Sequence, residues 1–326
     1  MKATFINNKR ALTNNSYNRK TLWKRIYDAR FLYLIFVPVA LYYILFHYAP
    51  MFNLETGGIF MAFTRYRIRT TFMELEWVGL HWFELLWGRP DFWQAIRNTF
   101  IISFGRLLFE FPMPIIIAIL LNEVAKSAPK RMFQTIFTFP HFLSWIIVYG
   151  VMQDLFSAGG LINSINRAFG NDAFLFLTNR SFPANMAMIF GTSIWRGAGW
   201  GAIIYLASIS GIDPTLYEAA KVDGANRMHC ILHITWPGIK PTAIVLLILT
   251  CGAIMNGGFD QIFQFINGVN QDLLDILDTY IFRFGFGGQM NPSFAAAAGL
   301  FRSVVNFALL LSANKIARLL GSEGLF

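Results

Sequence analysis

Six segments of this sequence are each apolar enough to cross a lipid bilayer as a helix. A bilayer-crossing helix needs about 20 predominantly apolar residues. Hydrophobic residues make up 55% of the chain and charged residues only 14%, whereas soluble domains average about 25% charged residues. The pattern predicts an all-α polytopic membrane protein with about six transmembrane helices. The expected spans cover residues 31–49, 99–121, 133–156, 184–208, 242–256 and 294–313.

The net charge of +9 is distributed unevenly between the two sides of the membrane. With the N-terminus inside, the cytoplasmic segments hold 16 Lys or Arg residues against 6 Asp or Glu residues, and the outer segments hold 8 against 10. Short loops rich in Lys and Arg stay in the cytoplasm, so both termini are predicted to be cytoplasmic. The positive charge therefore reflects topology, and nucleic acid is not expected as a partner.

We expect one transmembrane domain, because the chain has no internal repeat and no Pro-, Gly- or Ser-rich linker. This domain is placed at residues 31–320, between a cytoplasmic N-terminal segment 1–30 and a cytoplasmic tail 321–326. No small-residue cleavage site follows the first apolar stretch, so no cleaved signal peptide is expected. Tryptophans in the outer segment 50–98 are typical of an interfacial belt or of a short amphipathic helix at the membrane surface.

The cytoplasmic loop 211–241, between the fourth and fifth spans, has the clearest local pattern. Asp213 is a favourable N-cap and is followed by proline at the first helical position. Gly224 then interrupts this helix, and we expect it to need a positive φ or a close backbone approach. A second short helix over 226–234 is predicted to stop at Pro237. The loop therefore reads as helix–turn–helix.

The first of these helices has a face suited to another protein. Tyr217, Ala220 and Lys221 fall at positions i, i+3 and i+4, with Glu218 beside them. The paired alanines permit close approach, and a short helix pressed into a partner's groove is a common recognition mode. Glu218 is expected to pair with a basic or backbone N–H site on that partner, the alternative being a solvated carboxylate.

Glu218, Ala219 and Ala220, followed by Gly224 and then by Ile234 and Pro237, resemble the EAA loop of permease subunits of binding-protein-dependent ABC importers. Trp236 stands where that family usually has leucine. The resemblance extends over residues 31–320. It includes segments 122–124, 133–135, 140–145, 199–207, 259–262 and 295–299, which are similar to the branch importing complex sugars such as aldouronate and alginate-type oligosaccharides.

The resemblance implies a type I permease of the bacterial inner membrane that pairs with a second homologous permease and two ATPase subunits. ATP and Mg would be bound by the ATPases, because this sequence has no GxxxxGK[ST] phosphate loop. The chain itself is thus expected to be no enzyme and to bind no cofactor. An extracytoplasmic binding protein would deliver an oligosaccharide for alternating-access import. The implied coupling residues are Tyr217, Glu218, Ala219, Ala220, Asp223, Gly224, Ile234 and Pro237.

Charged residues within the spans are candidates for substrate contact, because a charge in the membrane usually faces the bundle interior or water. Arg196 lies beside Trp195 in a glycine-containing stretch, and arginine matches a carboxylate with two parallel bonds. We hypothesise that Arg196, with Arg302, contacts an acidic sugar, and that Tyr205 and Asn256 line the same cavity. Alternatively, each arginine reaches an interface or pairs with an intramembrane acid, Glu110 or Asp154.

Other groups of His, Cys and Asp residues are weaker evidence for a functional site. His229 and His233, at i and i+4, lack a third metal ligand, and Cys230 and Cys251 form no metal-site spacing. The row Asp272, Asp275 and Asp278 is expected to be a solvated outer face rather than a calcium or glycosidase site. The alternatives to an acidic-sugar permease are a neutral-oligosaccharide permease, a secondary transporter and a membrane enzyme.

Overall fold

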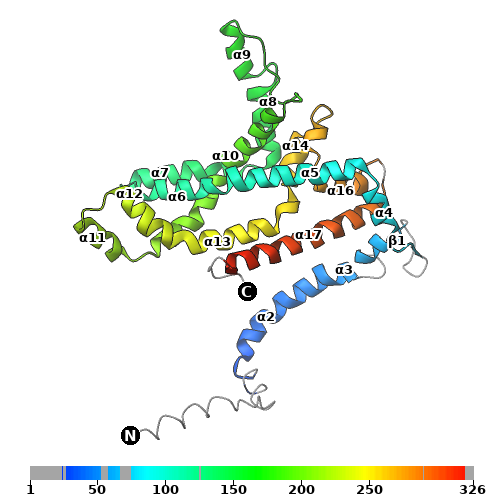
Figure 1. Ribbon diagram of the computed structural model, residues 1–326, viewed down its shortest axis with the longest axis horizontal. Coiled ribbons are helices and arrows are strands. Elements are labelled where there is room, and N and C mark those ends of the chain that lie inside the picture. The colour runs from blue at the N-terminus through cyan, green and yellow to red at the C-terminus, as the bar shows by residue number, and fades with distance from the viewer. Residues whose placement is uncertain are drawn as a thin grey trace. The chain divides into compact units, whose positions relative to one another are not determined.

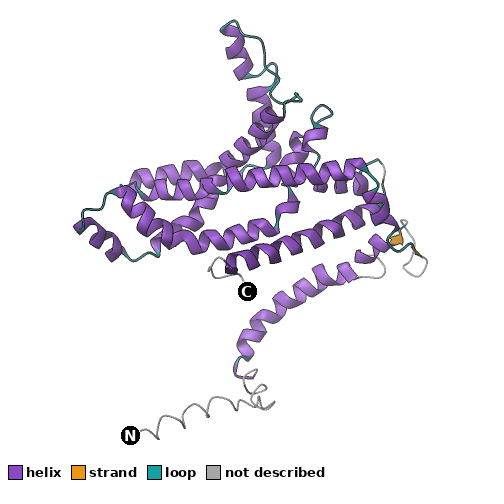
Figure 2. Cartoon of the chain, in the orientation of Figure 1, coloured by secondary structure: helices purple, strands orange, loops and turns teal. Residues whose placement is uncertain are grey.

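The computed structural model describes residues 24, 27–52, 58–66, 75–124, 126–288 and 290–319. These residues are mostly helical, with loops between the helices and one short antiparallel strand pair (Figure 2). The expectation of an all-α fold is therefore confirmed. The predicted cytoplasmic ends fall almost wholly outside the described residues. The chain divides into two units, one made of Met1–Phe60 and Arg67–Leu75, the other of Met61–Tyr66 and Glu76–Phe326.

The first unit contains a single long helix. It comprises α2 (Arg30–Tyr43), a π-helical turn η1 (Ile44–Tyr48) and α3 (Ala49–Phe52). The 23 residues Arg30–Phe52 extend about 35 Å at 1.5 Å per residue, which exceeds the roughly 30 Å hydrocarbon core of a bilayer. The predicted span 31–49 is therefore present as a helix.

The second unit is a bundle of helices with the strand pair β1 (Thr64–Arg65) and β2 (Glu76–Trp77). The 3-10 helix η2 (Gly58–Phe63) begins in the first unit. The helices that follow it in chain order are α4 (His81–Trp87), α5 (Pro90–Gly105), η4 (Arg106–Glu110), α6 (Pro112–Asn122), α7 (Ser127–Thr138), η5 (Phe139–Phe142), α8 (Trp145–Phe156), α9 (Leu161–Ala168), α10 (Phe182–Ser210), α11 (Pro214–Val222), α12 (Arg227–Cys230), η6 (Ile231–Thr235), α13 (Trp236–Gly252), η7 (Ile254–Asn256), α14 (Phe259–Phe265), α15 (Gln271–Leu274), α16 (Leu277–Phe286) and α17 (Pro292–Leu319).

Five helical runs in the described part of the chain are long and apolar enough to cross a membrane. The expected span 184–208 is also helical, within the 29 residues of α10. It is not among the five, because Arg196 and several glycines lower its apolarity. The five runs are Arg30–Phe52, Pro90–Asn122, Trp145–Ala168, Arg227–Gly252 and Pro292–Leu319.

The predicted span 133–156 is wrong as a single helix. Helix α7 ends at Thr138, a 3-10 turn follows, and α8 begins at Trp145. Proline supplies no N–H to continue the ladder, and Pro140 lies in this turn. Ser144 then adopts an extended conformation and its hydroxyl caps α8 by accepting from the Ile147 N–H. Local backbone chemistry thus overrides the apolar composition.

The predicted helix stop at Pro237 is also wrong. The chain is helical from Arg227 to Gly252, through a π turn at Ile231–Thr235. In this turn the Trp236 N–H donates to the Ile231 carbonyl, five residues back. A π turn spaces successive carbonyls more widely, which accommodates the proline ring and its missing donor. The loop between helices α10 and α12 is therefore shorter than the predicted loop.

The outer segment 50–98 contributes more to the core than its tryptophans suggested. A short helix is present, α4, but Trp82 is buried and its indole N–H donates to the Thr64 carbonyl at 2.8 Å. Helix α5 begins at Pro90, nine residues before the span predicted at 99–121. Trp82 packs with aromatic residues of α5, α16 and α17 in one of three apolar clusters.

The other two clusters hold the middle of the second unit together. One joins α5, α8, α10 and the α14–α16 segment around Ile189 and Ile262. The other joins α6, α10 and α13 around Tyr205 and Ile239. This packing places α11 and α16 at opposite ends of the second unit (Figure 1).

Candidate functional site

Helix α11 begins with a well-formed cap. Asp213 has an extended backbone, and its carboxylate accepts a hydrogen bond from the Thr215 N–H at 3.0 Å. Pro214 occupies the first helical position, where a missing N–H costs nothing. The backbone hydrogen bond from Thr215 lowers the pKa of Asp213. The predicted N-terminus of this helix is confirmed.

The same helix ends in a Schellman turn. The Ala225 N–H donates to the Ala220 carbonyl at 2.9 Å, and the Gly224 N–H donates to the Lys221 carbonyl at 3.1 Å. Gly224 has φ +78°, a conformation that side chains disfavour. No atom lies within 4 Å of the position that a Cβ would take. The expectation of a positive φ at Gly224 is thus confirmed, and close backbone approach is not the reason for glycine here.

Two contacts attach this helix and its preceding turn to the next helical run. The hydroxyls of Tyr217 and Thr235 lie 2.9 Å apart, which joins α11 to the π turn η6. The Ile212 side chain rests on Gly238, where an added Cβ would collide with it. A displacement of α11 is therefore mechanically coupled to the start of α13.

Apart from Tyr217, which is bonded to Thr235, the implied coupling residues fall into two groups. Glu218 and Ala219 are exposed on α11, and Pro237 is exposed on α13. Four others line a groove of about 390 Å³ together with His229 and His233: Ala220, Asp223, Gly224 and Ile234.

Two further exposed residues of α11 were not predicted from the sequence as part of its surface. Leu216 and Val222 are 52% and 88% exposed, although apolar side chains gain free energy when they leave water. Their signal was present as two apolar residues flanking the Glu-Ala-Ala motif. Together they make the surface of α11 partly apolar.

The two histidines beside the groove are held by their neighbours. The rings are stacked with centroids 5.9 Å apart. His229 Nδ1 lies 2.9 Å from the Asn226 side-chain oxygen, and His233 Nδ1 lies 3.1 Å from the His229 carbonyl. In the described part of the chain, no group of three or more His, Cys, Asp or Glu residues could hold a metal ion.

Arg196 braces the break between α7 and α8. Its Nε donates to the Leu143 carbonyl at 2.8 Å, and its guanidinium lies 4.7 Å from the centre of the Trp145 ring. Leu143 is extended at the break, so its carbonyl is available for this bond. Trp195, next to Arg196, is 44% exposed. These contacts use one edge of the guanidinium.

The other predicted substrate-binding residues each contact different parts of the bundle. Arg302 on α17 forms an ion pair with Asp278 on α16. Asn256 accepts a hydrogen bond at 2.9 Å from Asn306, also on α17. Tyr205 is only 2% exposed, inside the apolar cluster between α6, α10 and α13.

Arg106 forms the intramembrane ion pair that was the alternative reading of such charges. It lies 3.7 Å from Glu110 across the π turn η4. It also donates to the Gln261 side chain at 2.5 Å, and Gln261 in turn donates to the Ile189 carbonyl at 2.7 Å. Gly258 permits this arrangement, because an added Cβ would lie 2.5 Å from the guanidinium. The cluster ties η4 to α10 and α14.

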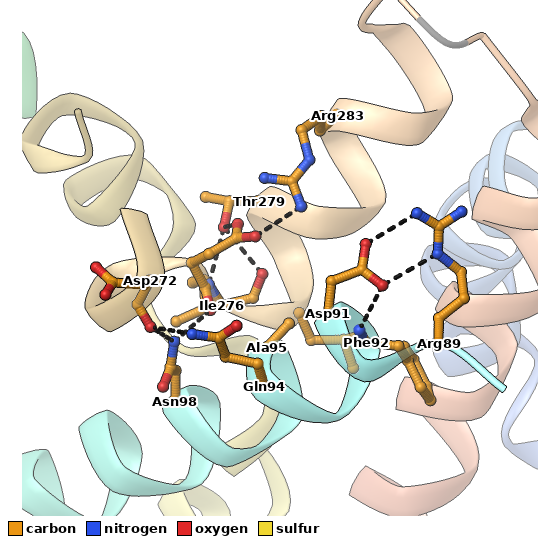
Figure 3. A network of polar contacts seen from close by, with 12 residues as sticks. Arg89, Asp91, Phe92, Gln94, Ala95, Asn98, Asp272, Ile276, Thr279 and Arg283 are labelled. Carbon is orange, nitrogen blue, oxygen red and sulfur yellow. Dashed lines mark hydrogen bonds and ion pairs between the residues drawn. The ribbon is translucent and has the colours of Figure 1, made fainter. Parts of the chain in front are cut away.

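A second polar network lies at the opposite end of the unit from α11 (Figure 3). Arg180 pairs with Asp272 at 2.7 Å, and Arg283 pairs with Asp275 at 2.7 Å. Arg89 forms two hydrogen bonds with Asp91, both at 3.0 Å. The prediction of a solvated acidic face is wrong, because α15 ends before Asp275 and each acid meets its own arginine.

Asp275 is the most enclosed acid of this network. It is 7% exposed and also accepts from the Thr279 hydroxyl at 2.7 Å. Burial raises the pKa of this carboxyl, while the Thr279 hydrogen bond and the Arg283 charge oppose the shift. The hydrogen bond from Arg180 lowers the pKa of the more open Asp272.

Helix α5 positions this network through backbone carbonyls. Asn98 donates to the carbonyls of Asp272 and Asp275 at 2.9 and 3.1 Å, and Gln94 donates to that of Asp272 at 2.7 Å (Figure 3). The network borders a cavity of about 890 Å³. The arginines that line this cavity were not predicted from the sequence as site residues. The sequence pattern that indicates a polar network here is the stripe of Asp91, Gln94 and Asn98 at i, i+3 and i+7.

Comparison with known proteins identifies clear relatives. Residues 110–321 match the family described as binding-protein-dependent transport system inner membrane component. The polygalacturonan/rhamnogalacturonan transport system permease protein YteP of Bacillus subtilis (strain 168) is 39% identical over 309 residues, 94% of each chain. Protein LplB of the same organism is 40% identical over 298 residues, 91% of each chain.

Solved structures agree with these relatives. One is the bacterial alginate ABC transporter in complex with an alginate pentasaccharide-bound periplasmic protein, with 36% identity and a TM-score of 0.81. The match covers 93% of this chain and 99% of that chain. A structure of a bacterial ABC transporter involved in importing the acidic polysaccharide alginate has the same identity and a TM-score of 0.79, covering 91% and 98%.

Proposed function

Given that this chain belongs to the family of binding-protein-dependent transport system inner membrane components, we propose that it is a permease subunit of an ATP-driven importer of acidic oligosaccharides. Its partners are a second permease, two ATPase subunits that bind ATP and Mg, and an extracytoplasmic binding protein. The chain spans the inner membrane, and both termini are cytoplasmic. The import activity of the whole assembly therefore depends on motion of this chain and not on catalysis by it.

The similarity to two acidic-polysaccharide transport proteins carries the substrate proposal. The matches to the polygalacturonan permease and the alginate transporter extend over more than nine-tenths of this chain. Uronate units bear one carboxylate per sugar ring, so their transporters must accommodate repeated negative charge. A neutral oligosaccharide is the competing substrate class.

The geometry of α11 supports its role as the coupling helix. It is capped at both ends, so it behaves as a rigid unit. It exposes Glu218 beside apolar Leu216 and Val222, a mixture suited to a groove on another protein. Its contacts with η6 and α13 lead directly into a membrane-spanning run. Closure of the ATPases on ATP would thus be transmitted into the bundle.

A pair of substitutions tests the coupling role. Glu218→Lys reverses the charge of the exposed motif carboxylate, and Gly224→Pro is incompatible with φ +78° because proline requires φ near −65°. We expect both variants to insert normally and to lose nearly all ATP-dependent uptake in proteoliposomes. Glu84→Lys on α4, an exposed charge reversal at the opposite end, should retain uptake. Normal transport by Glu218→Lys at equal expression would disprove the coupling assignment.

The sequence-predicted substrate contacts need a separate measurement. We propose that Arg196, with Trp195 beside it, contacts the sugar carboxylate, since only its Nε donates to the Leu143 carbonyl. Arg196→Ala should weaken uptake of uronate oligosaccharides more than uptake of neutral ones. Equal effects on both would assign Arg196 to bracing the α7–α8 break alone.

A further inference from the structure

The cavity beside the outer polar network has the size and lining of a ligand site. Its volume of about 890 Å³ lies within the 300–1,000 Å³ range usual for small-molecule sites. The lining includes three arginines, namely Arg89, Arg180 and Arg283, which come from three separate segments of the chain. Convergence of guanidinium groups on one hollow is the arrangement that recognises carboxylates.

We propose that this cavity binds a carboxylate-bearing sugar unit, with Arg180 exchanging Asp272 for the carboxylate of the ligand and Arg283 contacting that carboxylate through donors that Asp275 does not use. The inference rests on the proposed import of acidic oligosaccharides and adds a binding subsite at the predicted outer end of the permease.

The two arginines differ from Arg89 in how many hydrogen bonds they form with aspartate, although Arg283, like Arg89, also lies over aromatic rings. Arg89 is bonded to Asp91 through two nitrogens and lies over the Phe284 ring at 4.8 Å. Arg180 and Arg283 each reach one aspartate through a single nitrogen. A guanidinium has five N–H donors, so both retain donors for a second carboxylate. Arg89 is accordingly a fixed wall of the cavity.

Exchange of partners carries a small energetic penalty at Arg180. The Arg180 side chain is 73% exposed and that of Asp272 is 39% exposed, and ion pairs in such surroundings contribute little to stability. The Asp275 side chain is only 10% exposed, and a buried carboxylate without its cation is strongly destabilising. Arg283 therefore stays paired with Asp275 and contacts the ligand through its remaining N–H donors.

The test compares two trisaccharides that differ only in charge. Binding of trigalacturonate and of its carboxyl-reduced counterpart, galactotriose, is measured by calorimetry on the complete permease–ATPase complex, without the binding protein. We expect saturable binding of trigalacturonate and an affinity at least tenfold lower in Arg180→Gln. The affinity for galactotriose should be unchanged. Arg65→Gln, which removes an exposed ion pair with Glu76 outside the cavity lining, serves as the matched control.

A second variant distinguishes loss of ligand binding from loss of folding. Arg283→Lys retains a cation near the buried Asp275 but loses the planar fork, so trigalacturonate affinity should fall while the thermal unfolding temperature stays close to that of the wild type. No saturable binding by the wild type, or equal losses for both trisaccharides, would overturn the subsite. Uptake with the binding protein present separates the two proposals. If the wild type imports trigalacturonate but the arginine variants are indistinguishable from it, only the subsite fails.

Discussion

At the scale of single residues, the chain uses a few backbone-specific positions to shape α11. Asp213 begins the helix by accepting a backbone hydrogen bond, and Gly224 ends it with a positive φ. Gly224 has open space around it, so its identity is required by conformation alone. Substitutions at position 224 therefore test the backbone conformation without adding a steric clash.

Gly224→Ala should weaken the end of α11 through backbone strain. An L-residue in the left-handed region costs roughly 1–2 kcal/mol, whereas asparagine tolerates this region better. We expect uptake to decrease in the order Gly, Asn, Ala, with faster amide exchange at Ala225. Gly150→Ala, at another open position but within α8, should change neither quantity. Equal activity of all three residues at position 224 would contradict the strain argument.

The cap at Asp213 should make α11 sensitive to acid. Since its folded-state pKa lies below the ordinary value of 3.8, its stabilisation is complete above that value and is lost as the pH falls through the lowered folded-state pKa. The protection factors of the α11 amides, which correct for the slower intrinsic exchange at low pH, should therefore fall as the pH is lowered below about 4. Asp213→Asn keeps a capping oxygen that does not titrate, so its exchange protection should lack this transition. The same acid transition in both proteins would exclude Asp213 as its source.

At the scale of elements, interruptions within the helices determine the packing more than their apolarity does. The α7–α8 break exposes the Leu143 carbonyl that Arg196 binds. The π turn η6 allows the helix to continue through Pro237 and places Thr235 against Tyr217. The π turn η4 holds the Arg106–Glu110 pair. Each irregular turn thus lies next to a polar contact that links helices or charged residues of the bundle.

Close packing of α7 on α10 depends on Gly199. A Cβ at this position would collide with the Phe137 backbone carbonyl, whereas Gly197 on the same helix has no atom within 4 Å. Overpacking costs about 1–3 kcal/mol, so Gly199→Ala should lower the thermal unfolding temperature of the complex by several degrees. Gly197→Ala should not lower it, since alanine favours a helix. Similar behaviour of the two variants would show that α7 can move away at no cost.

At the scale of the whole molecule, the two polar regions of the second unit are separated along the bundle. The α11 surface lies at one end and the arginine–aspartate network at the other (Figure 1). The long run Pro90–Asn122 extends between these regions, and its last residue lies beside Pro214 and Tyr217. This separation is what a permease needs if it meets ATPases on one side of the membrane and substrate on the other.

The predicted orientation can be checked by labelling. In a background lacking Cys230 and Cys251, a cysteine at Asn171 should react with a membrane-impermeant maleimide in intact cells. A cysteine at Met228, in the α11–α13 region, should react only after the membrane is permeabilised. Both positions are exposed, so access to the reagent is the variable that differs. The reverse pattern would invert the topology.

The helical class, most of the spans and the capped helix within the loop 211–241 could be predicted from the amino-acid sequence. These features depend on local chemistry, namely apolar runs of sufficient length, an N-cap at Asp213 and a glycine at 224. A motif confined to one loop can be recognised because its spacing does not depend on the rest of the chain.

How distant polar residues pair could be learned from the packed helices alone. The spacing of the acids at 272, 275 and 278 predicts one face, yet each meets a different arginine, from segments 92, 8 and 24 residues away. The same holds for Arg106, whose partner Gln261 is 155 residues distant. Charge pairing is long-range and depends on which helices pack together, whereas periodicity reports only on neighbours along one helix.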